Sequence, residues 1–222
     1  MVKRESYAVI GLGQFGSSIC ESLVQAGQEV LTIDNNEEVI NEYSDSVMRA
    51  VIADAQDEDV LRDLDIGSFD HIYVSIGKNV EASIMVTLIA KELGAKDVIC
   101  RAENANHARV LEKIGADQVV RPEHDLAKRL VFQQLNPGVV DYVQLSKEVT
   151  LAEVNINNPK FFGKTLDELD FRNRYNVNVI IIVDANDQVN QMPQANDVIK
   201  PHDKVTVVGD LKDIKKLNSI VA

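Results

Sequence analysis

The sequence of 222 residues lacks tryptophan, has only two cysteines and five prolines, and is 5% aromatic. Cys20 falls inside an expected helix and Cys100 at the end of an expected strand, where a free cysteine usually acts as a small buried hydrophobe. Four histidines are scattered along the chain, at positions 71, 107, 124 and 202. Because they show no ligand spacing, the composition argues against a zinc site.

Basic residues are also scarce. Lys and Arg number 23 against 35 Asp and Glu, which gives a net charge of −12 at pH 7. Binding to the phosphates of DNA, RNA or an anionic membrane surface relies on clustered Lys and Arg, and the sequence has no such cluster. The charge therefore argues against nucleic acid or an anionic membrane surface as the main partner.

Long apolar runs are missing. Those at residues 84–90 and 177–183 fall far short of the roughly 20 residues that a transmembrane helix needs. Residues 1–6 lead directly into the first apolar run, which leaves no room for a signal peptide. We expect a soluble, cytoplasmic protein with 45% hydrophobic residues, enough for one domain of average size and a small one.

The most informative stretch is residues 7–16, where an apolar run breaks into three glycines with the spacing G-x-G-x-x-G. Residues 7–10 are typical of a buried parallel strand, and residues 14–25 carry apolar residues at helical spacing. The pattern therefore predicts a strand, a tight turn and a helix.

Each glycine has a role in such a turn. Gly11 permits the turn, Gly13 lets the backbone approach a pyrophosphate, and Gly16 lets the helix lie close to the strand. Gln14 and Phe15 open the helix, whose free N–H groups suit an anion. We therefore expect a nucleotide site at this loop.

A carboxylate strengthens this prediction. Residues 30–33 read as a second strand that ends at Asp34, at a separation from the glycines that suits a ribose-binding carboxylate. Asn35 or Asn36 follows as the cap of the next helix. A carboxylate at this position recognises a free ribose diol, so a 2′-phosphorylated cofactor is not expected.

Strands and helices continue to alternate after Asp34. Further strands are expected at residues 48–53, 71–75, 97–101 and 117–120. Helices are expected at residues 54–64, 80–93, 104–114 and 123–135. Because parallel strands need crossover connections, this alternation predicts a Rossmann-like α/β domain with a doubly wound parallel sheet in the order 3-2-1-4-5-6.

The ligand of such a sheet lies where the strand order reverses, between the first and fourth strands. Besides the glycine loop and Asp34, we expect this crevice to be bordered by Asp54, Ala55, Ser75, Ile76 and Gly77. Asp54 and Ser75 are equally well explained as caps of helices or turns, and this alternative stays open.

The pattern changes at Asn136-Pro137-Gly138, a strong breaker. Residues 139–145 read as a connecting helix or arm. Short strands with one helix follow at 150–156, 166–174, 177–183, 188–191 and 204–208, and a last helix at 211–220. We expect a nucleotide-binding domain at 1–138 and an arm with a small α+β domain at 139–222. The small domain has roughly 70 residues, near the lower limit for an adequate core, and is expected to dimerise.

Three segments resemble a known family. They are AVIGLGQFGSS at residues 8–18, VLEKIGAD at 110–117 with the following Arg121-Pro122-Glu123, and FGKTLDELDFRNRY at 162–175. Together they resemble the cytosolic regulatory subunits of Ktr and Trk potassium transporters, TrkA/KtrA-like proteins with N- and C-terminal RCK domains. The resemblance covers nearly the whole chain. The third segment discriminates best, because a nucleotide-binding dehydrogenase has no reason to carry it.

The resemblance implies a homo-oligomer, with dimers assembled into an octameric ring under a membrane-embedded potassium transporter at the inner face of the membrane. ATP and ADP in the N-terminal crevices would drive two ring shapes, and no catalysis is implied. By position, Gly11, Gly13 and Gly16 would surround the phosphates and Asp34 would hold the ribose.

Other positions carry over in the same way. Asp54, Ser75 and Ile76 would border the adenine side, with Arg101 near the crevice. Glu123 matches an acidic residue that helps bind a divalent cation, Mg²⁺ or Ca²⁺, near the terminal phosphates. As an alternative, Glu123 is simply a carboxylate in the first turn of a helix.

Gln14 departs from the family. Relatives often carry arginine there, whose guanidinium can reach the terminal phosphate, whereas glutamine offers a neutral amide. The departure favours ADP, AMP or a dinucleotide over ATP, and NAD stays an alternative ligand.

Some relatives also bind cyclic di-AMP between their C-terminal domains. By position, Arg172 would contact a phosphate, and Asn178, Val179 and Pro193 would line the bases. The alternative is a solvated helix end at Arg172, a core strand at Val179 and a turn at Pro193.

Two other functions remain as alternatives, a small NAD-dependent oxidoreductase and an NAD-binding redox sensor. An oxidoreductase needs an acid or base beside the nicotinamide, but Tyr43, Tyr73 and Tyr142 have no lysine four residues later. A redox-sensing repressor is opposed by the acidic charge and by the lack of a helix-turn-helix pattern. We therefore expect a protein that is not an enzyme.

Overall fold

The computed structural model describes residues 5–221, and its internal contacts divide the chain into two compact units, Met1–Glu123 and His124–Ala222. This division precedes the boundary expected at residues 138/139. Helix α6 (Pro122–Leu135) accounts for the difference, because its Phe132 packs into the core of the second unit and contacts Tyr142, with ring centroids 4.3 Å apart.

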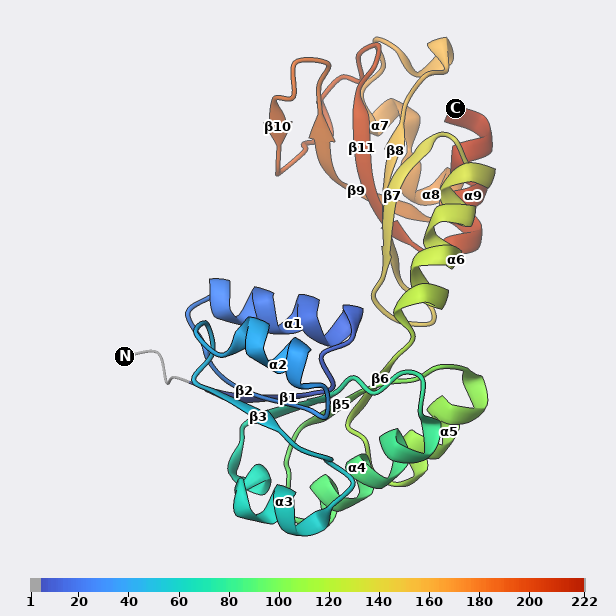
Figure 1. Ribbon diagram of the computed structural model, residues 1–222. Coiled ribbons are helices and arrows are strands. Elements are labelled where there is room, and N and C mark those ends of the chain that lie inside the picture. Colours follow the sequence, from blue (N-terminus) through green and yellow to red (C-terminus); the bar gives the residue numbers. More distant parts are fainter. Residues whose placement is uncertain (1–4, 222) are drawn as a thin grey trace. The chain divides into compact units, whose positions relative to one another are not determined.

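The first unit contains a parallel sheet in the order β3-β2-β1-β4-β5-β6, which confirms the predicted doubly wound topology (Figure 1). Its strands are β1 (Ser6–Ile10), β2 (Glu29–Asp34), β3 (Arg49–Ile52), β4 (His71–Val74), β5 (Val98–Arg101) and β6 (Gln118–Val120). Its helices are α1 (Gln14–Gln25), α2 (Glu37–Tyr43), α3 (Glu58–Asp63), the 3-10 turn η1 (Ile66–Ser68), α4 (Val80–Glu92) and α5 (Ala105–Lys113).

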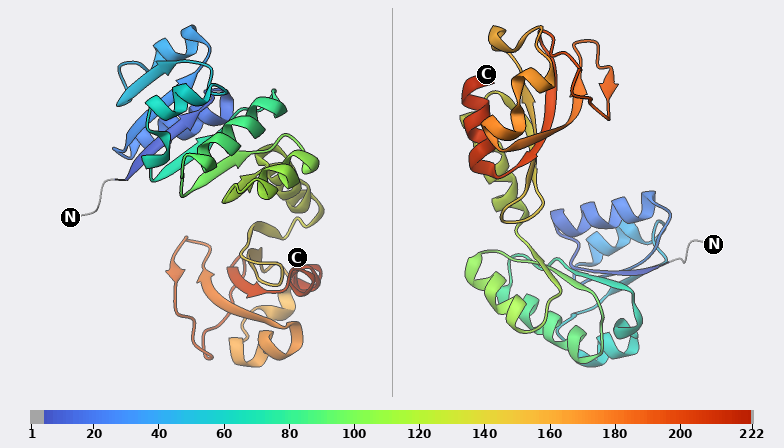
Figure 2. Two further views of the ribbon diagram at one scale, coloured as in Figure 1. Left: turned by 90° about the horizontal axis from the view of Figure 1, so that it is seen from below. Right: turned by 180° about the vertical axis from the view of Figure 1, so that it is seen from behind.

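Both faces of this sheet are buried, which explains the continuous apolar run of β1. Val9 packs with Cys20 and Ile40 under α1 and α2, whereas Ala8 and Ile10 pack on the other face, in the core beneath α3, α4 and α5. Figures 1 and 2 show these two helix layers on opposite faces of the sheet. All loops that leave the carboxyl ends of the strands are thereby directed to one edge, where a ligand site is expected.

Local signals set the helix ends. The Asn36 side chain accepts from the Glu38 backbone N–H at the start of α2, so of the two expected caps, Asn35 and Asn36, the second is the cap. Asp57 accepts from the Asp59 N–H at the start of α3 in the same way. After α4, Gly94 takes a φ of +91°, a left-handed conformation that favours glycine.

The second unit holds an antiparallel sheet in the order β10-β9-β11-β8-β7. Its strands are β7 (Val139–Gln144), β8 (Thr150–Asn155), β9 (Val177–Val183), β10 (Val189–Asn190) and β11 (Lys204–Gly209). Besides α6, its helices are η2 (Pro159–Phe161), α7 (Leu166–Leu169), α8 (Phe171–Tyr175) and α9 (Leu211–Val221). The core gathers Val154, Ile199, Val205, Ile214 and Leu217.

The segment 139–145 differs from its prediction as a connecting helix or arm. It forms the edge strand β7, which pairs antiparallel with β8. Val139 is buried and Tyr142 packs beside Phe132, while Val140 and Val143 are exposed, so only one face of the strand is covered. The apolar spacing of this segment combines the period of a strand with that of a helix. The strand was therefore not recognised from the sequence. Between residues 5 and 221, no helix is both long enough and apolar enough to cross a membrane.

Candidate functional site

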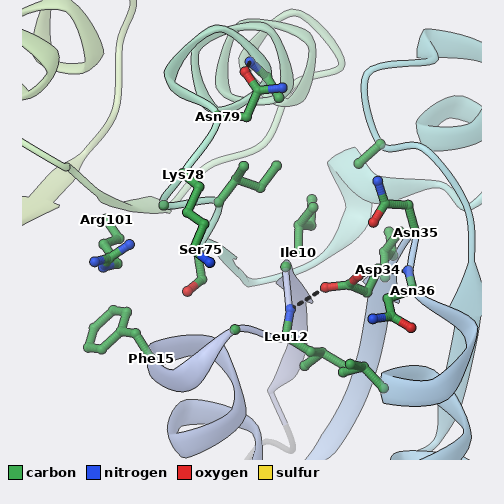
Figure 3. Close-up of a pocket in the computed structure, with 18 of the residues that line it drawn as sticks. Ile10, Leu12, Phe15, Asp34, Asn35, Asn36, Ser75, Lys78, Asn79 and Arg101 are labelled. Carbon is green, nitrogen blue, oxygen red and sulfur yellow. Dashed lines mark hydrogen bonds between the residues drawn. The ribbon is translucent and has the colours of Figure 1, made fainter.

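A cavity of about 850 Å³ lies at the carboxyl edge of the parallel sheet, next to the first turn of α1 (Figure 3). It brings together nearly all the site residues predicted for the first domain. These are Gly11, Gly13, Gln14, Phe15, Asp34, Asn35, Asp54, Ala55, Ser75, Ile76, Gly77, Arg101 and Glu123. Gly16 is absent from this lining.

The three glycines have different steric roles. Gly11 has a φ of +90°, and a Cβ there would lie 3.1 Å from the Ser75 carbonyl carbon. A Cβ on Gly16 would lie 1.9 Å from the carbonyl oxygen of Gly11, so Gly16 packs α1 against the loop. Around Gly13, by contrast, a Cβ would meet no atom within 4 Å. The turn at Gly11 and the close packing at Gly16 are confirmed, and the approach of a phosphate at Gly13 stays a prediction.

The N-terminus of α1 opens onto the same space. Its cap residue is Gly13, which offers no side-chain hydrogen bond, and the first turn contains no acidic residue. The N–H groups of this turn are therefore available to an anion, and the helix dipole favours negative charge there.

Asp34 is held rigidly at the end of β2. Its Oδ2 accepts a hydrogen bond from the Leu12 backbone N–H at 2.7 Å, drawn in Figure 3, and its Oδ1 accepts from the Asn36 N–H at 2.9 Å. The carboxylate thus connects the glycine loop to the second strand. Each oxygen keeps a further lone pair for a ligand hydroxyl.

Asp54 and Ser75 could each cap a turn or helix or border the ligand, and the structure gives a different answer for each residue. Asp54 Oδ1 accepts from the Gln56 backbone N–H at 3.0 Å, so it caps a turn while also lining the cavity. The Ser75 hydroxyl is buried and has no hydrogen-bond partner in the described part of the chain. Ser75 is therefore no cap, and its hydroxyl fits a polar ligand group.

Arg101 extends from the end of β5 into the cavity wall. Its Nη2 donates to Glu123 Oε1 at 2.6 Å and lies 3.8 Å from Glu103 Oε2. Its guanidinium lies against Gly77, where a Cβ would approach Nη1 to 1.6 Å. The backbone N–H of Glu123 and the Arg101 guanidinium together lower the pKa of the Glu123 carboxyl.

A divalent cation does not find a complete site in these residues. Within residues 5–221, no group of three or more His, Cys, Asp or Glu side chains can hold a metal ion. The Glu123 carboxylate is already paired with a guanidinium. Mg²⁺ commonly uses one or two carboxylates together with substrate phosphates, so a cation at Glu123 would require those phosphates.

The structure adds cavity residues that the sequence reasoning missed. They include Lys78, Asn79, Gln56 and Glu103. Lys78 and Asn79 lie in the loop between β4 and α4, directly after the predicted Gly77. Their signal was their place at the carboxyl end of a strand beside the switch point.

In the second unit, two of the four residues expected to bind cyclic di-AMP contact each other. The Arg172 Nε donates to Asn178 Oδ1 at 2.8 Å, which brings these two together. Val179 packs against the core. A smaller cavity of about 280 Å³ is lined by residues of β9, β10 and the segment 197–203, and none of the four lines it. The expected ligand therefore stays a prediction.

Comparison with known proteins agrees with this architecture. The TrkA-N domain model matches residues 7–122 and the TrkA-C domain model matches residues 151–222. Ktr system potassium uptake protein C of Bacillus subtilis (strain 168) is 42% identical over 218 residues, 98% of each chain. Ktr system potassium uptake protein A of the same strain is 37% identical over 98% of this chain and 97% of its own.

Among solved structures, the GsuK channel bound to NAD has a TM-score of 0.65 and 17% identity. The match covers 100% of this chain and 40% of the channel chain, and at this identity it shows the fold alone. With both domain models matched and relatives aligned over almost their whole length, the chain belongs to the TrkA-N/TrkA-C family, alongside Ktr system potassium uptake proteins A and C.

Proposed function

We propose that this chain is a nucleotide-sensing gating subunit of a potassium uptake system and binds ATP or ADP in its first unit. One observation carries the ligand class: the rigid Asp34 carboxylate and the uncapped first turn of α1 open onto one cavity. The first fits a ribose diol and the second a phosphate. The names of the two Bacillus relatives support the link to potassium uptake.

The partner is a membrane-embedded potassium transporter, with this chain at the inner face of the membrane. Each nucleotide biases an equilibrium between two shapes of the assembly, and contacts with the transporter carry that bias. A nucleotide can shift such an equilibrium only by its different affinities for the two shapes. The difference between ATP and ADP must therefore arise at the terminal phosphates.

The same proposal includes assembly into dimers and an octameric ring. Helix α6 supports a contact between copies, because four of its apolar side chains, Leu126, Leu130, Val131 and Leu135, are 56–75% exposed. Apolar residues gathered on one element are typical of a surface that another protein covers.

The cavity also supports a role without catalysis. Among residues 5–221, its lining contains no histidine, cysteine or tyrosine, the side chains most suited to proton transfer or nucleophilic attack near neutral pH. Of its carboxylates, Asp34 and Asp54 accept backbone hydrogen bonds and Glu123 pairs with Arg101. These carboxylates are thus held by partners within the protein, as suits groups that position a ligand.

Cyclic di-AMP is a separate proposal for the second unit. Arg172 is exposed, and its contact with Asn178 uses Nε, which leaves the terminal nitrogens for a phosphate. If Arg172 binds this messenger, Arg172→Ala weakens the binding of cyclic di-AMP and leaves the binding of adenine nucleotides unchanged. Unchanged messenger affinity would remove Arg172 from such a site.

A ligand panel tests the main proposal. Thermal unfolding is measured with ATP, ADP, NAD and cyclic di-AMP, because a ligand at about 100 times its Kd stabilises the native state by about 2.7 kcal/mol. Stabilisation by ATP or ADP supports the proposal. Stabilisation by NAD alone would overturn it in favour of an oxidoreductase or a redox sensor.

The variant Asp34→Ala, measured with the same ligands, tests the proposed ribose contact. The variant loses the ribose contact, so binding of ATP, ADP and NAD should fall together. It also loses two backbone hydrogen bonds, which lowers the unfolding free energy by about 1–3 kcal/mol. Asp63→Ala, an equal charge change at an exposed position of α3, serves as the control. Undiminished nucleotide affinity in Asp34→Ala would place the ribose elsewhere.

A further inference from the structure

Both cations of the cavity, Lys78 and Arg101, lie on one side of it, across from Asp34 (Figure 3). In Figure 3, Asp34 lies with Asn35 and Asn36 on one side of the end of β1, and Lys78 and Arg101 lie on the other. The carboxylate side suits a ribose and repels phosphate. A nucleotide bound through Asp34 therefore directs its phosphates across the glycine loop toward Lys78 and Arg101.

The two cations are not equivalent. Arg101 lies 2.6 Å from Glu123 and 3.8 Å from Glu103, so two carboxylates already neutralise its charge. Lys78 is exposed and has no ion-pair or hydrogen-bond partner in the part of the chain that the structure describes. Lys78 therefore contributes the one unpaired positive charge among the described lining residues.

The glycine loop provides no further cation. Gln14, the first residue of α1, has a neutral amide, and the first turn of α1 offers only backbone N–H groups. These N–H groups suit the phosphate nearest the loop, but they do not distinguish nucleotides by the number of phosphates beyond it. A lysine ammonium is a compact charge on a flexible stem and adapts to phosphates at different positions.

We propose that Lys78 is the residue by which this site distinguishes nucleotides by their number of phosphates, with the ammonium group contacting the phosphates beyond the first. This inference rests on the proposed function, because it assumes an adenine nucleotide in the cavity. Lys78 lies one residue before Asn79, whose side chain accepts from the Ala82 N–H and fixes the start of α4. The loop that carries Lys78 is thereby anchored beside the cavity.

Isothermal titration of the full chain with ATP, ADP and AMP tests this assignment, at low salt and without divalent cations. Lys78→Gln should weaken the binding of ATP by about tenfold, that of ADP less, and that of AMP hardly at all. The reason is that charge-assisted contacts to phosphate are lost in proportion to the number of phosphates. Lys78→Arg should keep the wild-type order. Lys96→Gln is the matched control, because Lys96 is an exposed loop residue at the opposite edge of the sheet, before β5.

The outcomes are distinct. A loss confined to ATP and ADP in Lys78→Gln, absent from Lys96→Gln, supports the proposal. An equal loss for all three nucleotides, or none, overturns it while the nucleotide site itself stands. If the unchanged protein binds no adenine nucleotide, the proposed function fails and this inference fails with it. A thermal melt of each variant without ligand confirms that the fold is retained.

Discussion

The guanidinium of Arg101 donates to the carboxylate of Glu123 over 2.6 Å and thereby joins the last residue of β5 to the first turn of α6. Both residues line the cavity. Anything that draws Arg101 toward a ligand phosphate must weaken this pair, and the exposed Glu123 then faces the same phosphate. The pair is therefore sensitive to charge in the cavity.

Replacing Glu123 tests this relationship. In Glu123→Gln, Arg101 is freed and a carboxylate near the phosphates is removed, so ATP should bind about three- to tenfold more tightly without divalent cations. Added Mg²⁺ should then improve binding by the wild type more than by the variant. Titration calorimetry with and without MgCl₂ measures both effects, with Glu112→Gln as an exposed control on α5. Weaker ATP binding by Glu123→Gln in the absence of Mg²⁺ would contradict this account.

Two glycine-to-alanine changes distinguish a rigid neighbour from a flexible one. At Gly16 the new Cβ would meet the carbonyl oxygen of Gly11 at 1.9 Å, and this backbone atom cannot move freely. At Gly77 it would meet Nη1 of Arg101 at 1.6 Å, a side-chain atom that can move. Gly16→Ala should therefore cost about 1–3 kcal/mol or more of unfolding free energy, and Gly77→Ala about 1 kcal/mol or less.

The two variants also differ in binding. Gly77→Ala displaces the guanidinium, so it should change ATP affinity at nearly normal stability. Urea unfolding and calorimetric titration separate the two quantities. Equal destabilisation by both substitutions would show that Arg101 is held as firmly as the backbone.

Much of this architecture was predictable because its signals are local. Buried strands produced continuous apolar runs, and Asn36, one of the two expected caps, marked the start of α2. The topology of a doubly wound sheet then placed Asp34 and Ser75 at one edge without any knowledge of side-chain positions.

What sequence reasoning missed depends on contacts between distant residues. The pairing of Arg101 with Glu123 joins residues 22 positions apart and leaves no periodic trace. Strand β7 was hidden because Tyr142 is covered by Phe132 of α6, a tertiary contact that decides which face is buried. Lys78 lies in an exposed loop, where neither periodicity nor propensity marks a residue.

Gln14 offers a direct test of how the loop treats charge. In Gln14→Arg, the first turn of α1 gains a guanidinium beside the cavity, and affinity for ATP relative to ADP should rise by about tenfold. Gln25→Arg adds the same charge at the other end of α1, where residue 25 is exposed, and should leave the ratio unchanged. Competition titrations measure the ratio. If both variants raise it equally, the effect is one of overall charge.

The amino edge of the parallel sheet carries a histidine that makes stability depend on pH. His71 Nδ1 lies 2.5 Å from Asp97 Oδ2, its Nε2 lies 3.3 Å from Glu5 Oε2, and the ring stacks on Tyr7. Burial lowers the pKa of His71, but the hydrogen bonds and charges of Asp97 and Glu5 outweigh it, so the pKa is raised. The protonated ring is thus favoured in the folded state.

A raised pKa fixes the sign of the effect. The contribution of His71 to stability is complete below about pH 6.5, its unfolded pKa, and is lost as pH rises through the folded value. His71→Gln should therefore flatten the fall in unfolding free energy above pH 6.5, by up to about 1 kcal/mol for partly exposed pairs. Denaturant unfolding at several pH values measures this, and His124→Gln provides the control. A fall as steep in His71→Gln as in the wild type would assign the pH dependence to other groups.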